Sequence, residues 1–334
     1  MNISFSFIIP VYNRPREIRE LLHSMTLLEG ETPFEVVIVE DGSEKDAQAV
    51  VEEYSEHLRI AYFKKENSGP GDSRNYGMRH AQGNYFIILD SDCLLPTSYL
   101  REVETELQRD FVDCFGGPDA AHASFTDLQK AINFAMTSFL TTGGIRGGKK
   151  AVSRFQPRSF NMGISRKAFE QTGGFGVIHP GEDPDLTIRI WAAGFMTRLF
   201  PKAFVYHKRR ISWKSFYTQV KKFGMVRPIL NSWHPHTRRI TYWFPTIFTA
   251  GLFLALITSL FGWTFLGYFY IVYFALVFLA ALGAEKSVKV ALMAVFAVLV
   301  QFFGYGTAFV RSHFLINLLG KDPEQVFPNL FFNR

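Results

Sequence analysis

The chain has 334 residues, of which 48% are hydrophobic and 20% are charged, and its net charge is +6 at pH 7. This length fits one large domain or two smaller ones, and the two cysteines exclude a disulfide-stabilised secreted scaffold and fit a reducing compartment. Basic residues concentrate at 202–239, directly before a strongly apolar stretch. This placement favours an anionic membrane surface over nucleic acid as a partner, although an ordinary solvated basic helix has the same pattern. The N-terminus lacks a basic region and a cleavage site, so we expect no signal peptide.

The first part of the chain alternates short apolar runs with amphipathic stretches. The apolar runs predict buried strands at residues 4–9, 34–39, 58–63 and 85–89. Helices are expected between them at 16–28, at 44–55 and after the glycine-rich loop 67–75. Alternation at this rhythm predicts an α/β fold with a mostly parallel central sheet and right-handed crossovers.

Two carboxylates, Asp90 and Asp92, follow the fourth strand directly. Ligands of open α/β sheets bind outside the carboxyl ends of the strands, and Mg²⁺ takes one or two carboxylates together with substrate phosphates. The pair therefore favours a metal–diphosphate site. A polar turn after a strand is the alternative, and the Asp-x-Asp pattern alone does not exclude it.

Polar residues also end the first two strands, at 10–13 and 40–43. The carboxylate of Asp41 can accept a hydrogen bond from the N3–H of a uracil-type base, and Tyr12 offers a flat face for stacking. Arg74 can neutralise a phosphate or contact the base, and its alternative is a charge on a helix surface. Each residue alone favours a structural reading, whereas their joint occurrence favours a nucleotide site.

Four blocks then carry a resemblance to a known family. They are FIIPVYN at 7–13, VIVEDGS at 37–43, GPGDSRN at 69–75 and LDSD at 89–92. In this order they resemble the inverting family 2 glycosyltransferases, which have the nucleotide-diphospho-sugar transferase (GT-A) fold. The resemblance covers about residues 1–225. One departure is Glu40, where the family more often has aspartate.

The resemblance implies roles for individual residues. Asp41 would hold the nucleotide base, with Tyr12 and Pro10 beside it. Arg74 would lie near the base or the phosphates. Asp90 would lie by the ribose, and Asp92 would bind Mg²⁺ or Mn²⁺ directly.

A second acidic cluster, Glu182-Asp183, opens an amphipathic helix. Acidic residues in a first helical turn often only cap the helix and complement its dipole. Inverting transfer, however, needs one general base within reach of the acceptor hydroxyl. The family's Glu-Asp motif matches these residues, so Asp183 is the expected base and Glu182 is expected to position the acceptor or a loop.

Further strands are expected at 112–116, 160–165, 196–200 and 203–206. The strand at 160–165 resembles the one that lines the donor sugar, which makes Asn161 an acceptor-side or loop residue. His207 follows the last strand and is a candidate for a further metal or phosphate contact. The segment 120–158 is expected to contain a helix at 125–140 and a glycine-rich loop at 141–150, and we assign it to the acceptor side as a hypothesis.

The apolar stretch predicts transmembrane helices at about 243–261, 265–283 and 290–310, because a span needs roughly twenty residues. They follow a catalytic domain at 1–225 and a basic interfacial linker at 226–242, and they precede a tail at 311–334. The helix at 213–223 has an apolar side that suits the membrane interface. Positive charges around the first pair place the catalytic domain on the cytoplasmic face of a bacterial plasma membrane. Three complete spans would put the basic tail on the far side, so the third segment could instead be re-entrant or interfacial.

The sequence thus predicts a membrane-anchored, metal-dependent inverting glycosyltransferase for cell-surface polysaccharide or glycolipid synthesis. Its partners would be a nucleotide-sugar donor, UDP-sugar favoured, a glycan or lipid-linked acceptor, and membrane lipids, with no nucleic acid. The alternatives are transfer to polyprenyl phosphate and a non-catalytic membrane scaffold. A nucleotidyltransferase would carry a basic glycine-rich loop after its first strand, and residues 10–13 are not such a loop.

Overall fold

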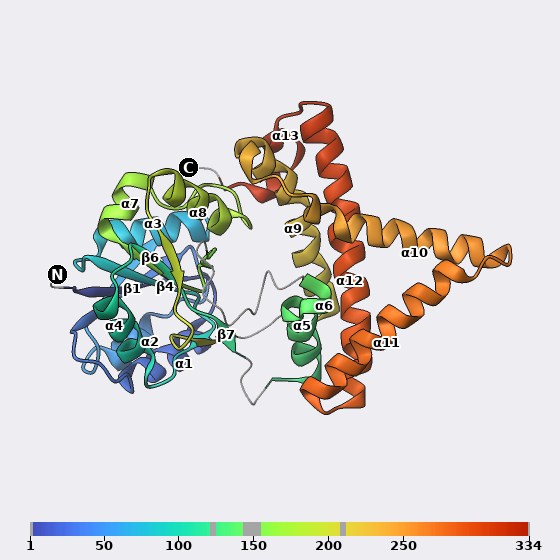
Figure 1. Ribbon diagram of the computed structural model, residues 1–334. Helices are drawn as coiled ribbons and strands as arrows, with labels where there is room; N and C mark the ends of the chain where they lie inside the picture. Colours follow the sequence, from blue (N-terminus) through green and yellow to red (C-terminus); the bar gives the residue numbers. More distant parts are fainter. Residues whose placement is uncertain (1–2, 121–124, 143–154, 208–211, 333–334) are drawn as a thin grey trace. The chain divides into compact units, whose positions relative to one another are not determined.

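The computed structural model describes residues 3–120, 125–142, 155–207 and 212–332. The chain divides into two compact units (Figure 1). The first comprises Met1–His122, Lys149–His207 and Phe331–Arg334, and the second comprises Ala123–Gly148 and Lys208–Leu330. The domain boundary expected at residue 225 falls within one helix, α9 (Trp213–Trp233).

The first unit contains a mixed sheet with the strand order β3-β2-β1-β4-β8-β6-β9. Its strands are β1 (Phe5–Val11), β2 (Phe34–Asp41), β3 (Ile60–Lys65), β4 (Tyr85–Leu89), β6 (Cys114–Gly116), β8 (Asn161–Ser165) and β9 (Thr197–Leu199). All neighbouring pairs are parallel except those of β8, which runs antiparallel to β4 and β6. The expected mostly parallel sheet is confirmed.

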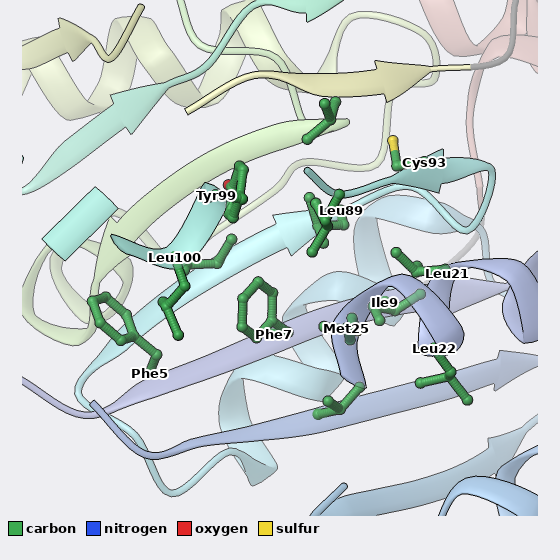
Figure 2. Close-up of a cluster of buried hydrophobic side chains, with 14 of the residues drawn as sticks. Phe5, Phe7, Ile9, Leu21, Leu22, Met25, Leu89, Cys93, Tyr99 and Leu100 are labelled. Carbon is green, nitrogen blue, oxygen red and sulfur yellow. The ribbon is translucent and has the colours of Figure 1, made fainter. Parts of the chain in front are cut away.

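Helices cover both faces of this sheet. They are α1 (Pro15–Thr26), α2 (Gln48–Tyr54), α3 (Pro70–His80), α4 (Tyr99–Arg109), α7 (Arg166–Thr172) and α8 (Glu182–Ala192). Side chains alternate between the faces of a strand, so Phe5, Phe7 and Ile9 of β1 pack with α1 and α4, as Figure 2 shows. Ile8 points to the opposite face, toward the cluster that includes Met78 of α3. Burial on both faces explains why the central strands are continuous apolar runs.

A small second sheet begins directly after the Asp90–Asp92 turn. It consists of β5 (Cys93–Leu94), β10 (Val205–His207) and β7 (Asp119–Ala120) in the order β5-β10-β7. The register sets His207 opposite Cys93, the residue that follows Asp92. Two segments that lie far apart in the sequence therefore meet at the Asp90–Asp92 turn.

The second unit is helical. Its helices are α5 (Asp127–Thr137), α6 (Phe139–Thr142), α9, α10 (Phe244–Leu260), α11 (Phe265–Glu285), α12 (Val288–Ser312) and α13 (Pro323–Val326), and a π-helical turn (His313–Leu318) follows α12. Three stretches, Ile240–Leu260, Phe265–Glu285 and Val288–Leu318, are long and apolar enough to cross a membrane. The three expected apolar helices are therefore present. The helix expected within 125–140 is α5, whereas most of the loop at 141–150 lies outside the described residues.

The apolar side of α9 is covered within the second unit. Phe216 and Val220 are buried in one cluster with α12. The two helices approach so closely that a Cβ on Gly224 would lie 2.3 Å from the carbonyl oxygen of Tyr305. The expectation that this side of the helix faces the membrane interface is wrong, because α12 occupies it.

The first unit offers a direct test of its core. Phe115 is fully buried and stacks on Phe200 with ring centroids 4.3 Å apart. We expect Phe115→Ala to lower the free energy of unfolding by roughly 3–5 kcal/mol because it opens a cavity. Thermal unfolding in detergent measures this loss. Phe111→Ala, which truncates a half-buried ring, is the control and should cost clearly less; equal melting temperatures for both variants would contradict the packing described.

Candidate active site

The carboxyl ends of β2, β1 and β4 lie side by side in the sheet. Asp41 is the last residue of β2, Tyr12 follows β1, and Asp90 follows β4. Pro10 lies in β1 opposite Val39. The tyrosine ring is 53% exposed, so it is available to a ligand. The polar residues that the sequence placed at three strand ends are thus brought to one edge.

Asp41 organises the loop after β3. Its Oδ1 accepts hydrogen bonds from Lys65 Nζ at 2.7 Å and from the Ser68 amide at 2.9 Å, and its Oδ2 accepts from the Gly69 amide at 3.0 Å. Sequence reasoning missed Lys65. Its position at the end of the neighbouring strand could have identified it, because the register of the two strands pairs it with Asp41.

Arg74 lies in the centre of the site and is only 3% exposed. Its NH2 donates to Asp90 Oδ1 at 2.8 Å and its NH1 donates to Glu182 Oε1 at 3.2 Å. The guanidinium also lies 5.2 Å from the ring centroid of Phe175. The alternative of a charge on a helix surface is wrong, because this arginine joins the two acidic clusters of the sequence.

Glu182 is the first residue of α8 and is buried. Burial raises its pKa, but His179, whose Nδ1 lies 2.8 Å from Oε1, and Arg74 outweigh burial and lower the pKa to about 2. Glu182 is therefore ionised at neutral pH. His179 was not predicted from the sequence, although it precedes the glutamate by only three residues.

The adjacent Asp183 has the opposite electrostatic environment. Burial and the charge of Glu182 raise its pKa to about 6, although Arg74, Arg158 and the Ser159 hydroxyl act against this rise. Its Oδ1 is buried and has no hydrogen-bond partner among the described residues. A carboxylate that titrates close to neutral pH and has an unused oxygen is suited to accept a proton.

The Asp90–Asp92 turn supplies oxygen donors that fit a hard divalent cation. Asp92 Oδ2 pairs with Arg14 NH1 at 2.5 Å. In the described part of the chain, no cluster of three or more His, Cys, Asp or Glu side chains forms a metal cage. Mg²⁺ often takes only one or two protein carboxylates, the remaining ligands being substrate phosphates and water, so this donor set fits the ion provided that Arg14 moves aside.

The two remaining candidates differ in placement. The backbone of His207 is next to the Asp90–Asp92 turn, and its side chain lies outside what the structure describes. Asn161 is fully buried, with its Oδ1 accepting from Tyr99 OH at 2.7 Å and its Nδ2 donating to the Ala203 carbonyl at 2.8 Å. Both ends of its amide are thus occupied in the fold, and its backbone lies opposite Leu89, the residue before Asp90.

The model of the family "Glycosyl transferase family 2" matches residues 6–173, half of the chain. The chain belongs to this family. The poly(ribitol-phosphate) beta-N-acetylglucosaminyltransferase TarS of Staphylococcus aureus is 33% identical over 103 residues, which are 30% of this chain and 18% of that protein. The probable glycosyltransferase YdaM of Bacillus subtilis is 26% identical over 223 residues, 64% of this chain and 53% of that protein. An uncharacterized glycosyltransferase of Rickettsia felis is 39% identical, and the match spans only 16% of its length.

Solved structures share the fold across nearly the whole chain. The mannosyltransferase PcManGT of Pyrobaculum calidifontis, in complex with GDP-Man and Mn²⁺, has a TM-score of 0.55 at 17% identity and covers 96% of this chain and 89% of that one. TarS 1–349 of S. aureus in complex with UDP has a TM-score of 0.50 at 18% identity, covering 96% and 92%. The chain therefore has a GT-A-type fold.

The environment of Asp183 predicts a stability effect with a defined sign. Its folded pKa of about 6 exceeds the value of 3.8 for a free aspartate. Folding thus favours the protonated form of Asp183. The favourable contribution of this protonated form to the free energy of unfolding is fully present below pH 3.8 and is lost as the pH rises through 6. We expect Asp183→Asn to stabilise the protein at pH 8 by up to roughly 2–3 kcal/mol and to have little effect at pH 4.

Melting temperatures at the two pH values measure this difference. The matched control is Asp46→Asn, since Lys64 holds the pKa of that exposed carboxylate below its usual value. This control should bring no gain at pH 8. If Asp183→Asn raises the melting temperature above that of the wild type no more at pH 8 than at pH 4, the described environment is contradicted.

Proposed function

We propose that this chain is a membrane-anchored inverting glycosyltransferase. It moves a sugar from a nucleotide-diphospho-sugar, UDP-sugar favoured, to a hydroxyl of a glycan or a lipid-linked acceptor. The observation that carries the proposal is Asp183, a carboxylate with a pKa near 6 and an unpartnered buried oxygen, which Arg74 connects to the strand-end carboxylate Asp90.

The donor nucleotide would bind at the edge of β2, β1 and β4. Asp41 would receive the N3–H of the base, and the exposed Tyr12 with Pro10 would pack beside it. Asp90 would contact the ribose. Arg74 is buried and its two terminal nitrogens are each paired with a carboxylate, so it would act on the donor through Asp90 and not as a free phosphate-binding cation.

The neighbouring carboxylates of α8 have separate roles. Asp183 takes the proton of the acceptor hydroxyl as the oxygen attacks the anomeric carbon from the face opposite the leaving diphosphate. Glu182 remains ionised and is fixed by His179 and Arg74. Its charge keeps the pKa of Asp183 high enough for efficient proton transfer near neutral pH. Glu182 therefore positions and tunes the base.

The metal ion would be Mg²⁺ or Mn²⁺ at Asp92, with His207 as a candidate second contact. When bound, the cation neutralises the leaving diphosphate as a Lewis acid. The mannosyltransferase with this fold was solved with Mn²⁺, which supports a divalent cation here. It also binds GDP-Man, whereas TarS binds UDP, so both nucleotides belong in the test.

Transfer to polyprenyl phosphate is the competing reaction. In that case the acceptor is already an anion and needs no base. The raised pKa of Asp183 and its unpartnered Oδ1 support a neutral hydroxyl acceptor, because such an acceptor must lose a proton and a phosphate need not.

Donor turnover tests the proposed chemistry. We expect the full chain in detergent to release nucleotide from one member of a panel of UDP-, GDP- and dTDP-sugars, only with Mn²⁺ or Mg²⁺. The rate should rise with pH through an apparent pKa of about 6, since Asp183 must be ionised. Asp92→Ala and Asp183→Asn should each lower the rate by about a hundredfold or more. Glu44→Gln, on an exposed turn, is the control.

The outcomes separate the candidates. Substantial activity of Asp183→Asn would refute the base assignment and favour polyprenyl phosphate as the acceptor. If the wild type neither releases nor binds any nucleotide, the glycosyltransferase proposal fails and the scaffold takes its place.

The anchor in the membrane would be the hairpin of α10 and α11. These are the least covered of the apolar stretches, with 17% of the span buried in each against 39% in the third. Phe331 pairs with Ile178 of the first unit, so the chain enters and leaves the helical unit on the same side of the membrane. This supports an even number of complete crossings between the two points, in place of the three spans expected from the sequence.

An ion pair supports α12 as the helix that would not cross. Lys289, near the start of α12, lies 2.9 Å from Asp127 of α5. Asp127 follows Ala120 of the first unit by seven residues. Such a stretch reaches at most about 25 Å, which is less than the roughly 30 Å of hydrocarbon in a bilayer. In this proposal both ends of α12 would remain on the catalytic side, which we assign to the cytoplasm of a bacterial plasma membrane.

Cysteine labelling tests this topology, because the native Cys93 and Cys114 are buried. In sealed vesicles of known orientation, an impermeant maleimide should modify E44C in the catalytic unit and E324C after α12 from the cytoplasmic side. It should modify W263C, in the turn between α10 and α11, only from the other side. Labelling of E324C and E44C from opposite sides would refute the hairpin anchor.

A further inference from the structure

Two residues near the end of the sequence form part of the first unit. Phe331 pairs with Ile178 through an isolated antiparallel bridge. The amide of Phe332 donates to the Val177 carbonyl at 3.0 Å. These backbone contacts fix Phe331 and Phe332 against the segment that leads into Glu182.

The ring of Phe332 lies directly on Gly69. A Cβ at this glycine would be 2.3 Å from Cγ of Phe332, so no other residue could stand there without displacing the ring. Gly69 also has a φ of +91°, which glycine adopts readily. Its amide is one of the donors that hold Asp41. The ring therefore covers the peptide that orients the proposed base-binding carboxylate.

The same ring touches the loop before α8. Its centroid lies 6.0 Å from that of His179, and the two planes are tilted by 54°. His179 in turn contacts Glu182 at 2.8 Å. One side chain thus contacts the loop at the nucleotide end of the site and the loop that holds the carboxylates at the acceptor end.

We propose that Phe332 is a positioning residue that holds the 67–69 loop and the 177–182 loop together and thereby sets the affinity for the donor nucleotide. This inference rests on the proposed binding of a nucleotide at Asp41. Two loops that are ordered before the ligand arrives lose less conformational entropy on binding, so their preorganisation strengthens affinity. Loss of the ring frees both loops at once.

Isothermal titration of the full chain in detergent with UDP and with GDP, each in the presence of Mn²⁺, measures this role. We expect Phe332→Ala to weaken nucleotide binding by about tenfold and Phe332→Tyr, which keeps the ring, to restore it. The matched control is Phe111→Ala, a half-buried phenylalanine of the same unit with one ring neighbour, Tyr85 at 6.1 Å. It should lower the melting temperature without changing nucleotide affinity.

Hydrogen exchange of the ligand-free protein supplies a second measurement. Phe332→Ala should speed exchange at the amides of Gly69 and of 181–183, and Phe111→Ala should leave them protected. Unchanged affinity in Phe332→Ala, or equal weakening in Phe111→Ala, would overturn the inference and leave the proposed function intact. If the wild type binds neither nucleotide, the proposed function and this inference fall together, whatever the exchange pattern.

Discussion

The site depends on one buried ion-pair network centred on Arg74. A guanidinium that is almost fully removed from water is tolerable only when carboxylates compensate its charge, and here Asp90 and Glu182 do so from opposite sides. Glu182 is in turn held ionised, and its charge raises the pKa of Asp183. One cation thus joins the proposed nucleotide-binding edge of the sheet to the first turn of α8. Removing it would leave the buried Glu182 with His179 as its remaining charge partner and would break the link to the partly exposed Asp90.

Much of the fold was predictable because buried strands and helices have recognisable apolar patterns in the local sequence. Strands covered on both faces, such as β4, are unbroken apolar runs, and Asp90 marks where β4 leaves the core. The apolar helices were predictable by length alone. The antiparallel insertion of β8 and the packing of α9 on α12 were not, because pairing partners and helix neighbours depend on contacts between residues far apart in the chain. The amphipathic pattern of α9 predicts a buried side but does not identify the element that covers it.

Those residues of the candidate site that lie in family motifs were predictable from the sequence. Asp41, Asp90 and Glu182 lie in such motifs, and the structure brings the last two to the same arginine. The partners that fix these groups were missed because their function depends on geometry. Lys65 reaches Asp41 only through strand register, and Phe332 reaches Gly69 from 263 positions along the chain. The partners of Asn161, the Tyr99 hydroxyl and the Ala203 carbonyl, were missed for the same reason.

The discontinuity of the first unit also governs the order in which the protein can be completed. Synthesis delivers the seven strands and α8 well before it delivers α10, α11 and α12. Domains generally fold as units while the chain emerges. Here, however, the ring that covers Gly69 arrives only after the apolar helices have been made. A chain that ends before these helices are complete therefore lacks the side chain that covers Gly69, and the first unit is finished only when the whole helical unit has been made.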